Sequence, residues 1–201
     1  MMSGYVQNDQ HEEALRLYMT MRRLSVDRIR LAFCVLFHSC SISSTGQLLL
    51  AHLAKTPFVS NVYVGTSLVD MYAKCGNLAD AQSSFASISA PNVAAWTAFI
   101  SRHAHHGLGS EAILRFQHMV KQKIDPNAAT FVGLLSACCR AVLVNEGKGV
   151  FYTTEKIYRV IPTLEHHACV VDLLGRSGLL LEAKEFIRQM PIEADAIIWG
   201  K

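Results

Sequence analysis

NVYVGTSLVDMYAKCGNLADAQSSFASI, from Asn61 to Ile88, indicates the fold of the chain, because it contains two apolar stripes of helical spacing on either side of a glycine. Apolar residues recur every four positions in the first stripe and at intervals of three and four in the second, as one face of an α-helix requires. The stripes are Val64, Leu68 and Tyr72, then Leu78, Ala81, Phe85 and Ile88. Gly76 lies between them, where a residue that tolerates positive φ can end the first helix. The segment therefore predicts two helices joined by a tight turn.

The same pattern recurs along the chain. The small residue inside the second stripe is Ala14, Ala81, Ala112, Gly147 and Ala183 in successive copies, and the last three intervals are 31, 35 and 36 residues. The first interval, 67 residues, has room for two copies, and the one between Arg30 and Asn61 is eroded. Prolines follow the second helices at Pro91, Pro126, Pro162 and Pro191 and prevent their continuation. Because one hairpin cannot bury its apolar stripe alone, this period predicts a stack of helical hairpins.

Composition excludes several classes of protein. The chain has 201 residues, 51% hydrophobic and 17% charged, which is too apolar for an intrinsically disordered protein. The longest apolar runs, such as Leu31–Phe37, are far shorter than the roughly 20 residues of a membrane span. The net charge of +3 permits nucleic-acid binding without requiring it. The six cysteines lie in apolar segments without a C-x-x-C pair, so we expect reduced, mostly buried thiols. The early acidic residues Asp9, Glu12 and Glu13 are not typical of an organellar presequence, and we expect none in this chain.

These residues resemble the pentatricopeptide repeat family, in the plant subclass that mixes repeats of different length. The resemblance implies an all-α fold, an α-solenoid of stacked helix-turn-helix repeats forming a right-handed superhelix. It divides the chain into a partial repeat (1–29), a degenerate long-type repeat (30–61), a short-type repeat (62–92), a standard repeat (93–127), a long-type repeat (128–163), a closing short-type repeat (164–195) and the start of a truncated extension motif (196–201). Asp9 and Val142 depart from the pattern, because the family usually has glycine between the helices at these places. We expect a truncated member of the family.

The family resemblance also implies a function and the residues that perform it. Such arrays bind single-stranded RNA, and two side chains of each repeat read one base. The expected base-reading pairs are Thr66 with Asn92 and Thr97 with Asn127, which in this family favour adenine. Weaker RNA contacts are expected from Tyr63, Ala94, Ala168 and Asp195. The alternative from spacing alone is that the threonines lie on a solvent face and the asparagines are turn residues.

We expect neither catalysis nor a cofactor. His103, His105 and His106 have no cysteine at ligand spacing, and adjacent helical histidines point in different directions, so no metal site is expected. His11 and Glu13 match the H-x-E of zinc deaminases without the required C-x-x-C. The resemblance implies the RNA-binding module of a plant organellar factor for RNA editing or another RNA modification or processing step, in a mitochondrion or plastid. The expected partners are RNA and further proteins of an editing complex, with no membrane and no small-molecule substrate. The alternatives are a protein-binding solenoid of the tetratricopeptide type and a non-functional truncated gene product.

Overall fold

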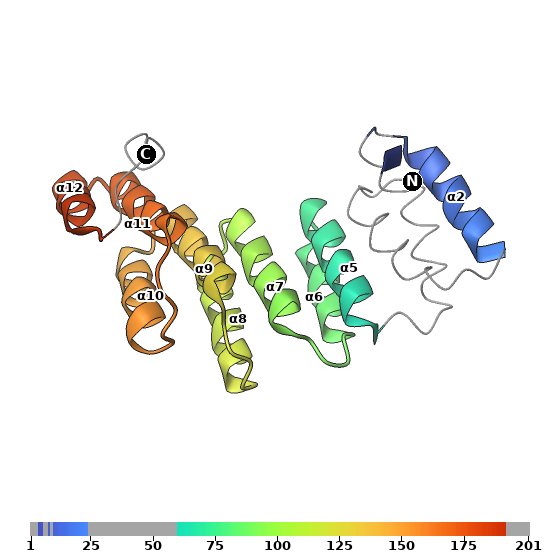
Figure 1. Cartoon of the computed structure of the whole chain (residues 1–201), viewed down its shortest axis with the longest axis horizontal. Coiled ribbons are helices and arrows are strands. Elements are labelled where there is room, and N and C mark those ends of the chain that lie inside the picture. Colours follow the sequence, from blue (N-terminus) through green and yellow to red (C-terminus); the bar gives the residue numbers. More distant parts are fainter. Residues whose placement is uncertain (1–3, 6–7, 9, 24–59, 192–201) are drawn as a thin grey trace. The chain divides into compact units, whose positions relative to one another are not determined.

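The computed structural model describes residues 4–5, 8, 10–23 and 60–191, and these ranges contain helices and turns but no strand (Figure 1). The degenerate repeat expected over 30–61 lies almost entirely outside the described residues, as do Asp195 and the segment 196–201. The helices are α2 (His11–Arg23), α5 (Val62–Lys74), α6 (Leu78–Ala86), α7 (Val93–His105), α8 (Gly109–Lys121), α9 (Ala128–Arg140), α10 (Val144–Lys156), α11 (Leu164–Arg176) and α12 (Leu180–Gln189). The all-α prediction is confirmed.

The chain forms two compact units, Met1–Phe99 and Ile100–Lys201, and the boundary falls within α7. In the first unit α5 and α6 form the hairpin that the opening stretch predicts. Asn61 caps α5 by accepting a hydrogen bond from the backbone N–H of Tyr63 at 3.1 Å. Gly76 has φ of +78° in the turn, as expected, and the Asn77 side chain caps α6.

Aromatic side chains pack the hairpin of the first unit against the start of α7. The ring of Phe85 on α6 stacks on that of Phe99, with centroids 4.4 Å apart, and meets the edge of Trp96 at 4.6 Å. All these side chains are nearly or fully buried. Because buried aromatic pairs contribute more than their area alone, Phe85 is a principal contact of this core.

In the second unit α9 is the central helix, since it packs against α8, α10 and α11. Its side chains Phe131, Leu134 and Leu135 are at most 1% exposed. Gly107 and Gly178 take positive φ in the turns between paired helices. Val142 occupies the equivalent turn between α9 and α10 and also takes φ of +55°, which a β-branched residue adopts only under strain. The chain therefore keeps the positive-φ turn at this position although valine replaces the usual glycine.

Two further expectations concern cysteines and membranes. The four described cysteines, Cys75, Cys138, Cys139 and Cys169, form no disulfide, and Cys138 and Cys139 are buried. Cys34 and Cys40 lie outside the described residues. Of the helices in the described ranges, none combines the length and the apolar character that crossing a membrane requires.

Candidate nucleic-acid interface

The first helix of each hairpin carries one recurring stripe of side chains, which is exposed at both ends. The helices α5, α7, α9 and α11 each have 13 residues. Their second, fifth, ninth and thirteenth residues span about 80° of the helix circumference. We call these positions the first-helix stripe; they are Tyr63, Thr66, Asp70 and Lys74 on α5, Ala94, Thr97, Ser101 and His105 on α7, Ala129, Val132, Ser136 and Arg140 on α9, and Glu165, Ala168, Asp172 and Arg176 on α11. In all of them the second and thirteenth residues are exposed and the fifth is half-buried. The predicted residues Tyr63, Thr66, Ala94, Thr97 and Ala168 all belong to this stripe.

Thr66 is half-buried and makes a hydrogen bond within its own helix. Its Oγ1 donates to the backbone oxygen of Val62 at 2.6 Å, one helical turn earlier. The hydroxyl proton is therefore used within the helix, and the oxygen lone pairs can accept a hydrogen bond from a ligand. Tyr63, on the preceding turn, has a side chain 60% exposed and offers an aromatic face for stacking.

Asn92 and Asn127 are helix caps. The Oδ1 of Asn92 accepts from the backbone N–H of Ala95 at 3.0 Å, at the start of α7. Asn127 and Thr130 form a reciprocal capping box at the start of α9, with the Thr130 N–H donating to Asn127 Oδ1 at 3.0 Å. Asn92 and Asn127 are therefore turn residues, as the alternative from spacing alone predicted. This role uses only the carbonyl oxygen of each side chain and orients the Nδ2 amino group away from the backbone N–H that it caps.

The two expected base-reading pairs differ in whether their residues lie in the same compact unit. Thr66 and Asn92 lie in the same unit, where the Ser89 N–H donates to the Ser60 oxygen at 3.3 Å and joins the start of α5 to the loop before α7. No hydrogen bond joins the two side chains among the described contacts. Thr97 and Asn127 belong to different units, and each is described within its own.

A basic residue at the thirteenth position is a feature that the sequence analysis missed. Lys74, Arg140 and Arg176 end their helices, and His105 ends α7. Lys74 Nζ lies 2.8 Å from Asp70 Oδ2, and Arg176 Nε lies 3.0 Å from Asp172 Oδ1. The Arg140 guanidinium is exposed and has no partner within the described part of the chain. The signal available in the sequence was the basic residue or histidine eight positions after the fifth residue of each first helix.

A polar cavity of about 230 Å³ lies between α9 and α11, beside Ala168. Its lining is Ser136, Cys139, Arg140, Ala168, Cys169, Asp172 and Arg176. The Cys139 thiol donates to Asp172 Oδ2 at 3.1 Å. Burial, reinforced by this hydrogen bond, raises the pKa of Cys139 to about 12, so the thiol stays protonated. Ala168 itself offers no polar group, and the polar groups near it come from its neighbours on the stripe.

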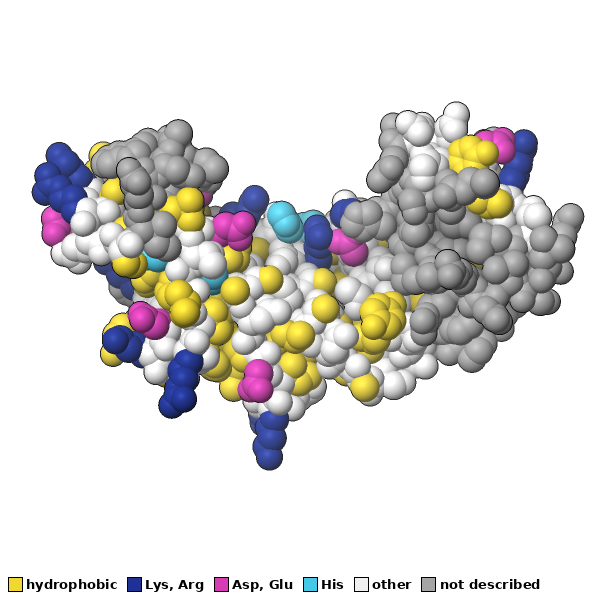
Figure 2. All heavy atoms as spheres, in the orientation of Figure 1, with side chains coloured by type: hydrophobic (Ala, Val, Ile, Leu, Met, Phe, Trp, Pro, Cys, Tyr) yellow, Lys and Arg dark blue, Asp and Glu magenta, His cyan; other side chains and the backbone are white. Residues whose placement is uncertain are grey.

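Figure 2 shows one face of the described residues, on which hydrophobic side chains are scattered and the basic and acidic side chains project at separate points. In the described ranges, no group of three or more His, Cys, Asp or Glu side chains is arranged to hold a metal ion. The stripe has a polar ninth residue on all four first helices, a threonine at the fifth position on α5 and α7 only, and a lysine or arginine at its end on α5, α9 and α11.

Known sequences and structures carry the same repeats. A model described as "PPR repeat family" matches residues 91–140, and a "PPR repeat" model matches residues 1–26 and 168–193. A pentatricopeptide repeat-containing protein of Arabidopsis thaliana is 48% identical over 155 residues, covering 77% of this chain and 25% of that protein. A second Arabidopsis protein of this description is 39% identical over 203 residues, covering 100% of the chain and 28% of its own length. The chain thus spans about a quarter of these relatives.

Solved structures of the family have the same fold. The maize protein PPR10 aligns with a TM-score of 0.68 at 17% identity, covering 98% of this chain and 30% of that one. The complex of PPR10 with an 18-nucleotide psaJ RNA element aligns with a TM-score of 0.69 at 18% identity, covering 85% of this chain and 26% of that one. The α-solenoid prediction is confirmed by this likeness, whereas the mixed-length subclass and the truncation stay predictions. By its repeats, its helical hairpins and these relatives, the chain belongs to the pentatricopeptide repeat family.

Proposed function

We propose that this chain is a single-stranded RNA-binding module of a plant organellar RNA-processing or RNA-editing factor. The observation that carries the proposal is the first-helix stripe, which repeats a polar ninth residue and a basic thirteenth residue on α5, α9 and α11. Solved relatives include PPR10 with its RNA element and the repeat domain of Arabidopsis protein-only RNase P 1 with tRNA. Several relatives are described as mitochondrial or chloroplastic, which supports an organellar location. The chain spans a fraction of each relative, and our proposal assigns catalysis to another domain or a recruited protein.

The chemistry of Thr66 and Asn92 suggests which bases this module favours. The Thr66 oxygen can accept a hydrogen bond, because its proton is already donated to Val62. The Asn92 amino group can donate, because its oxygen is already used by the cap. With the Thr66 oxygen facing the exocyclic amino group and the Asn92 amino group facing the ring nitrogen, the pair matches the Watson–Crick edge of adenine or cytosine. In the reverse order the same two groups match uracil or guanine. The family pairing pattern selects adenine, and a short threonine leaves room for a purine.

The basic ends of the stripe suggest how the backbone is bound. A lysine or arginine beside a phosphate releases counterions, which makes affinity depend on salt. Arg140 is suited to this role because no described carboxylate neutralises it, whereas Lys74 and Arg176 are each held by an aspartate one turn earlier. We expect Arg140 to contribute more to phosphate binding than either of them.

Anisotropy with fluorescent single-stranded RNA tests this function. Adenine-rich RNA should bind more tightly than uracil-rich RNA, and a duplex of the same length should bind less. Arg140→Gln should reduce the slope of log affinity against log salt by about 0.7, the value for one phosphate contact in a single strand. Lys156→Gln, at the end of the second helix α10, is the matched control and should leave the slope unchanged. Equal slopes for both variants, or peptide binding that competes with RNA, would favour the tetratricopeptide-like alternative.

A further inference from the structure

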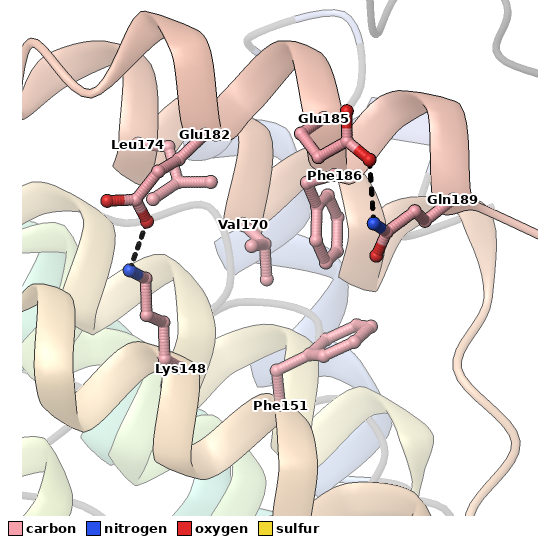
Figure 3. Close-up of a pocket in the computed structure, with 8 residues that line it drawn as sticks. All are labelled: Lys148, Phe151, Val170, Leu174, Glu182, Glu185, Phe186 and Gln189. Carbon is pink, nitrogen blue, oxygen red and sulfur yellow. Dashed lines mark hydrogen bonds and ion pairs between the residues drawn. The ribbon is translucent and has the colours of Figure 1, made fainter.

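The second helices of the last two described hairpins border an apolar cavity that the proposed RNA interface does not use. It has a volume of about 360 Å³ and lies between α10, α11 and α12 (Figure 3). Phe151, Val170, Leu174 and Phe186 form its apolar lining, and an ion pair between Lys148 and Glu182 spans one end of it. Val170 and Leu174 belong to the core of the second unit, so the cavity has a rigid floor.

A second cavity of about 410 Å³ adjoins the first. Both are lined by Phe151 and Phe186, whose rings meet edge to face with centroids 5.4 Å apart. Ile161, in the loop after α10, lines the second cavity and is 82% exposed. We call the two cavities together the α10–α12 groove. A large apolar side chain exposed at the edge of an apolar depression is typical of an interaction surface.

The charged residues that line the groove favour a positively charged ligand. Its ionised lining residues are Lys148, Glu155, Glu182 and Glu185, so its formal charge is −2 with His167 neutral, in a chain whose net charge is +3. The Glu155 carboxylate is exposed and has no partner in the described ranges. On α12 the acidic residues line the groove, whereas Lys184 and Arg188 do not, although Arg188 pairs with Glu185 at 3.7 Å from outside it. Phosphate groups would be repelled here, which distinguishes the groove from the first-helix stripe.

We propose that the α10–α12 groove docks an amphipathic helix of a partner protein, with large apolar side chains inserted and lysines or arginines flanking them. Two adjoining apolar cavities suit anchors one helical turn or more apart on one face of a helix. The net negative lining selects basic flanking residues. This docking site does not depend on RNA binding, because it is built mainly from second helices and the stripe from first helices.

The test uses the complete chain and a defined probe. The probe is a fluorescent helical peptide of about 18 residues, long enough to be helical, with leucines on one face and lysines elsewhere. A second peptide carries glutamates in place of the lysines, and a third carries glutamines in place of the leucines. Glu185→Lys changes the groove, and Glu146→Lys makes the same charge change on α10 outside it. Ile161→Ser removes an apolar contact from a residue that is almost fully exposed, so folding is preserved.

We expect the leucine–lysine peptide to bind best. Glu185→Lys should weaken it by about tenfold at low salt and Ile161→Ser should weaken it too, while Glu146→Lys leaves it unchanged. Equal loss in Glu185→Lys and Glu146→Lys would overturn the proposal, as would tight binding of the glutamine peptide. If a chain ending at Pro191 binds the peptide more tightly than the complete chain does, residues 192–201 occupy the groove instead of a partner. If the chain self-associates and Glu185→Lys abolishes this, the groove binds a second copy of the chain. If RNA competes with the peptide and Glu185→Lys abolishes the competition, the groove binds nucleic acid.

Discussion

Cys139 on α9 and Asp172 on α11 are joined by a hydrogen bond in which the thiol donates to the carboxylate over 3.1 Å. Asp172 also holds Arg176, so one carboxylate links the two neighbouring first helices and orients a basic residue of the stripe. Because the donor is a thiol, the link lasts only while Cys139 keeps its proton. Burial and the neighbouring carboxylate, by raising the pKa of Cys139 to about 12, ensure this at physiological pH.

The first prediction concerns the reactivity of this thiol. A shift in pKa from the ordinary value of 9.0 to about 12 lowers the thiolate fraction at pH 8 by about three orders of magnitude. Iodoacetamide should therefore modify Cys139 in the folded chain at least a hundredfold more slowly than in urea-unfolded chain, as measured by peptide mass spectrometry. Asp172→Asn removes one of the causes of the shift and should accelerate the reaction. Identical rates in folded and unfolded protein would contradict the raised pKa.

The second prediction concerns the strained turn between α9 and α10. Val142 has φ of +55°, a conformation that costs an L-residue with a branched side chain about 1–2 kcal/mol and costs glycine little. Val142→Gly should therefore raise the free energy of unfolding by about 1 kcal/mol, after allowance for the greater freedom of glycine in the unfolded chain. Urea titration followed by circular dichroism measures the change.

Ala141→Gly is the matched control, because Ala141 precedes the turn with a negative φ of −91°. Glycine there gains no relief of strain, so this variant should lose stability. Gly178→Val, in the equivalent turn between α11 and α12, should be destabilised by an amount similar to the gain in Val142→Gly. Stabilisation by Ala141→Gly, or none by Val142→Gly, would refute the strain argument.

Sequence patterns predicted the hairpins because helix spacing, turn glycines and terminal prolines are local signals. They also identified Val142 as the residue that replaces glycine. They did not reveal the Cys139–Asp172 contact or the α10–α12 groove, because both depend on how separate helices pack. The role of Asn92 and Asn127 was left open between base reading and turn formation. The hydrogen bonds explain why, since the Oδ1 atoms cap helices and the amino groups stay available.

The third prediction concerns stability at mildly acid pH. His166 is fully buried at the start of α11, and its Nδ1 accepts from the Thr163 N–H at 3.1 Å. Burial lowers its pKa, with a further lowering from His167 and opposing effects of the Ala128 backbone and Glu165. The unfolded chain therefore binds a proton near the ordinary pKa of 6.5, while the folded chain does not. Stability should be complete above this pH and should decline below it, by up to about 1.4 kcal/mol per pH unit.

His166→Gln isolates this effect, because glutamine at the third helical position preserves a capping box with Thr163. Urea midpoints between pH 5 and 7.5 should depend less on pH in His166→Gln than in the native chain. His106→Gln, at an exposed position after α7, should keep the native pH dependence. A native-like slope in His166→Gln would show that other groups cause the acid sensitivity.

The fourth prediction separates base reading from helix capping at Asn92. Asn92→Asp keeps the oxygen that caps α7 but removes the Nδ2 donor, so helix stability should be retained. Combined with Thr66→Asn, it gives the pair that in this family favours uracil, whose ring N–H would donate to the new carboxylate. The longer amide at position 66 also occupies space that a purine needs. The double variant should therefore shift preference from adenine towards uracil at one position, by about 1–3 kcal/mol by analogy with bidentate base contacts.

Competition between oligonucleotides that differ at that single base measures the shift, within an array extended by intact repeats so that binding is strong enough to follow. Asn92→Ala is the control for capping, because it removes both the cap and the donor and should cost about 1 kcal/mol of stability. If the double variant retains the native melting temperature and changes base preference, Asn92 reads a base in addition to capping α7. Equal weakening towards both oligonucleotides would instead confine Thr66 and Asn92 to structural roles, because loss of a general contact lowers affinity without regard to the base.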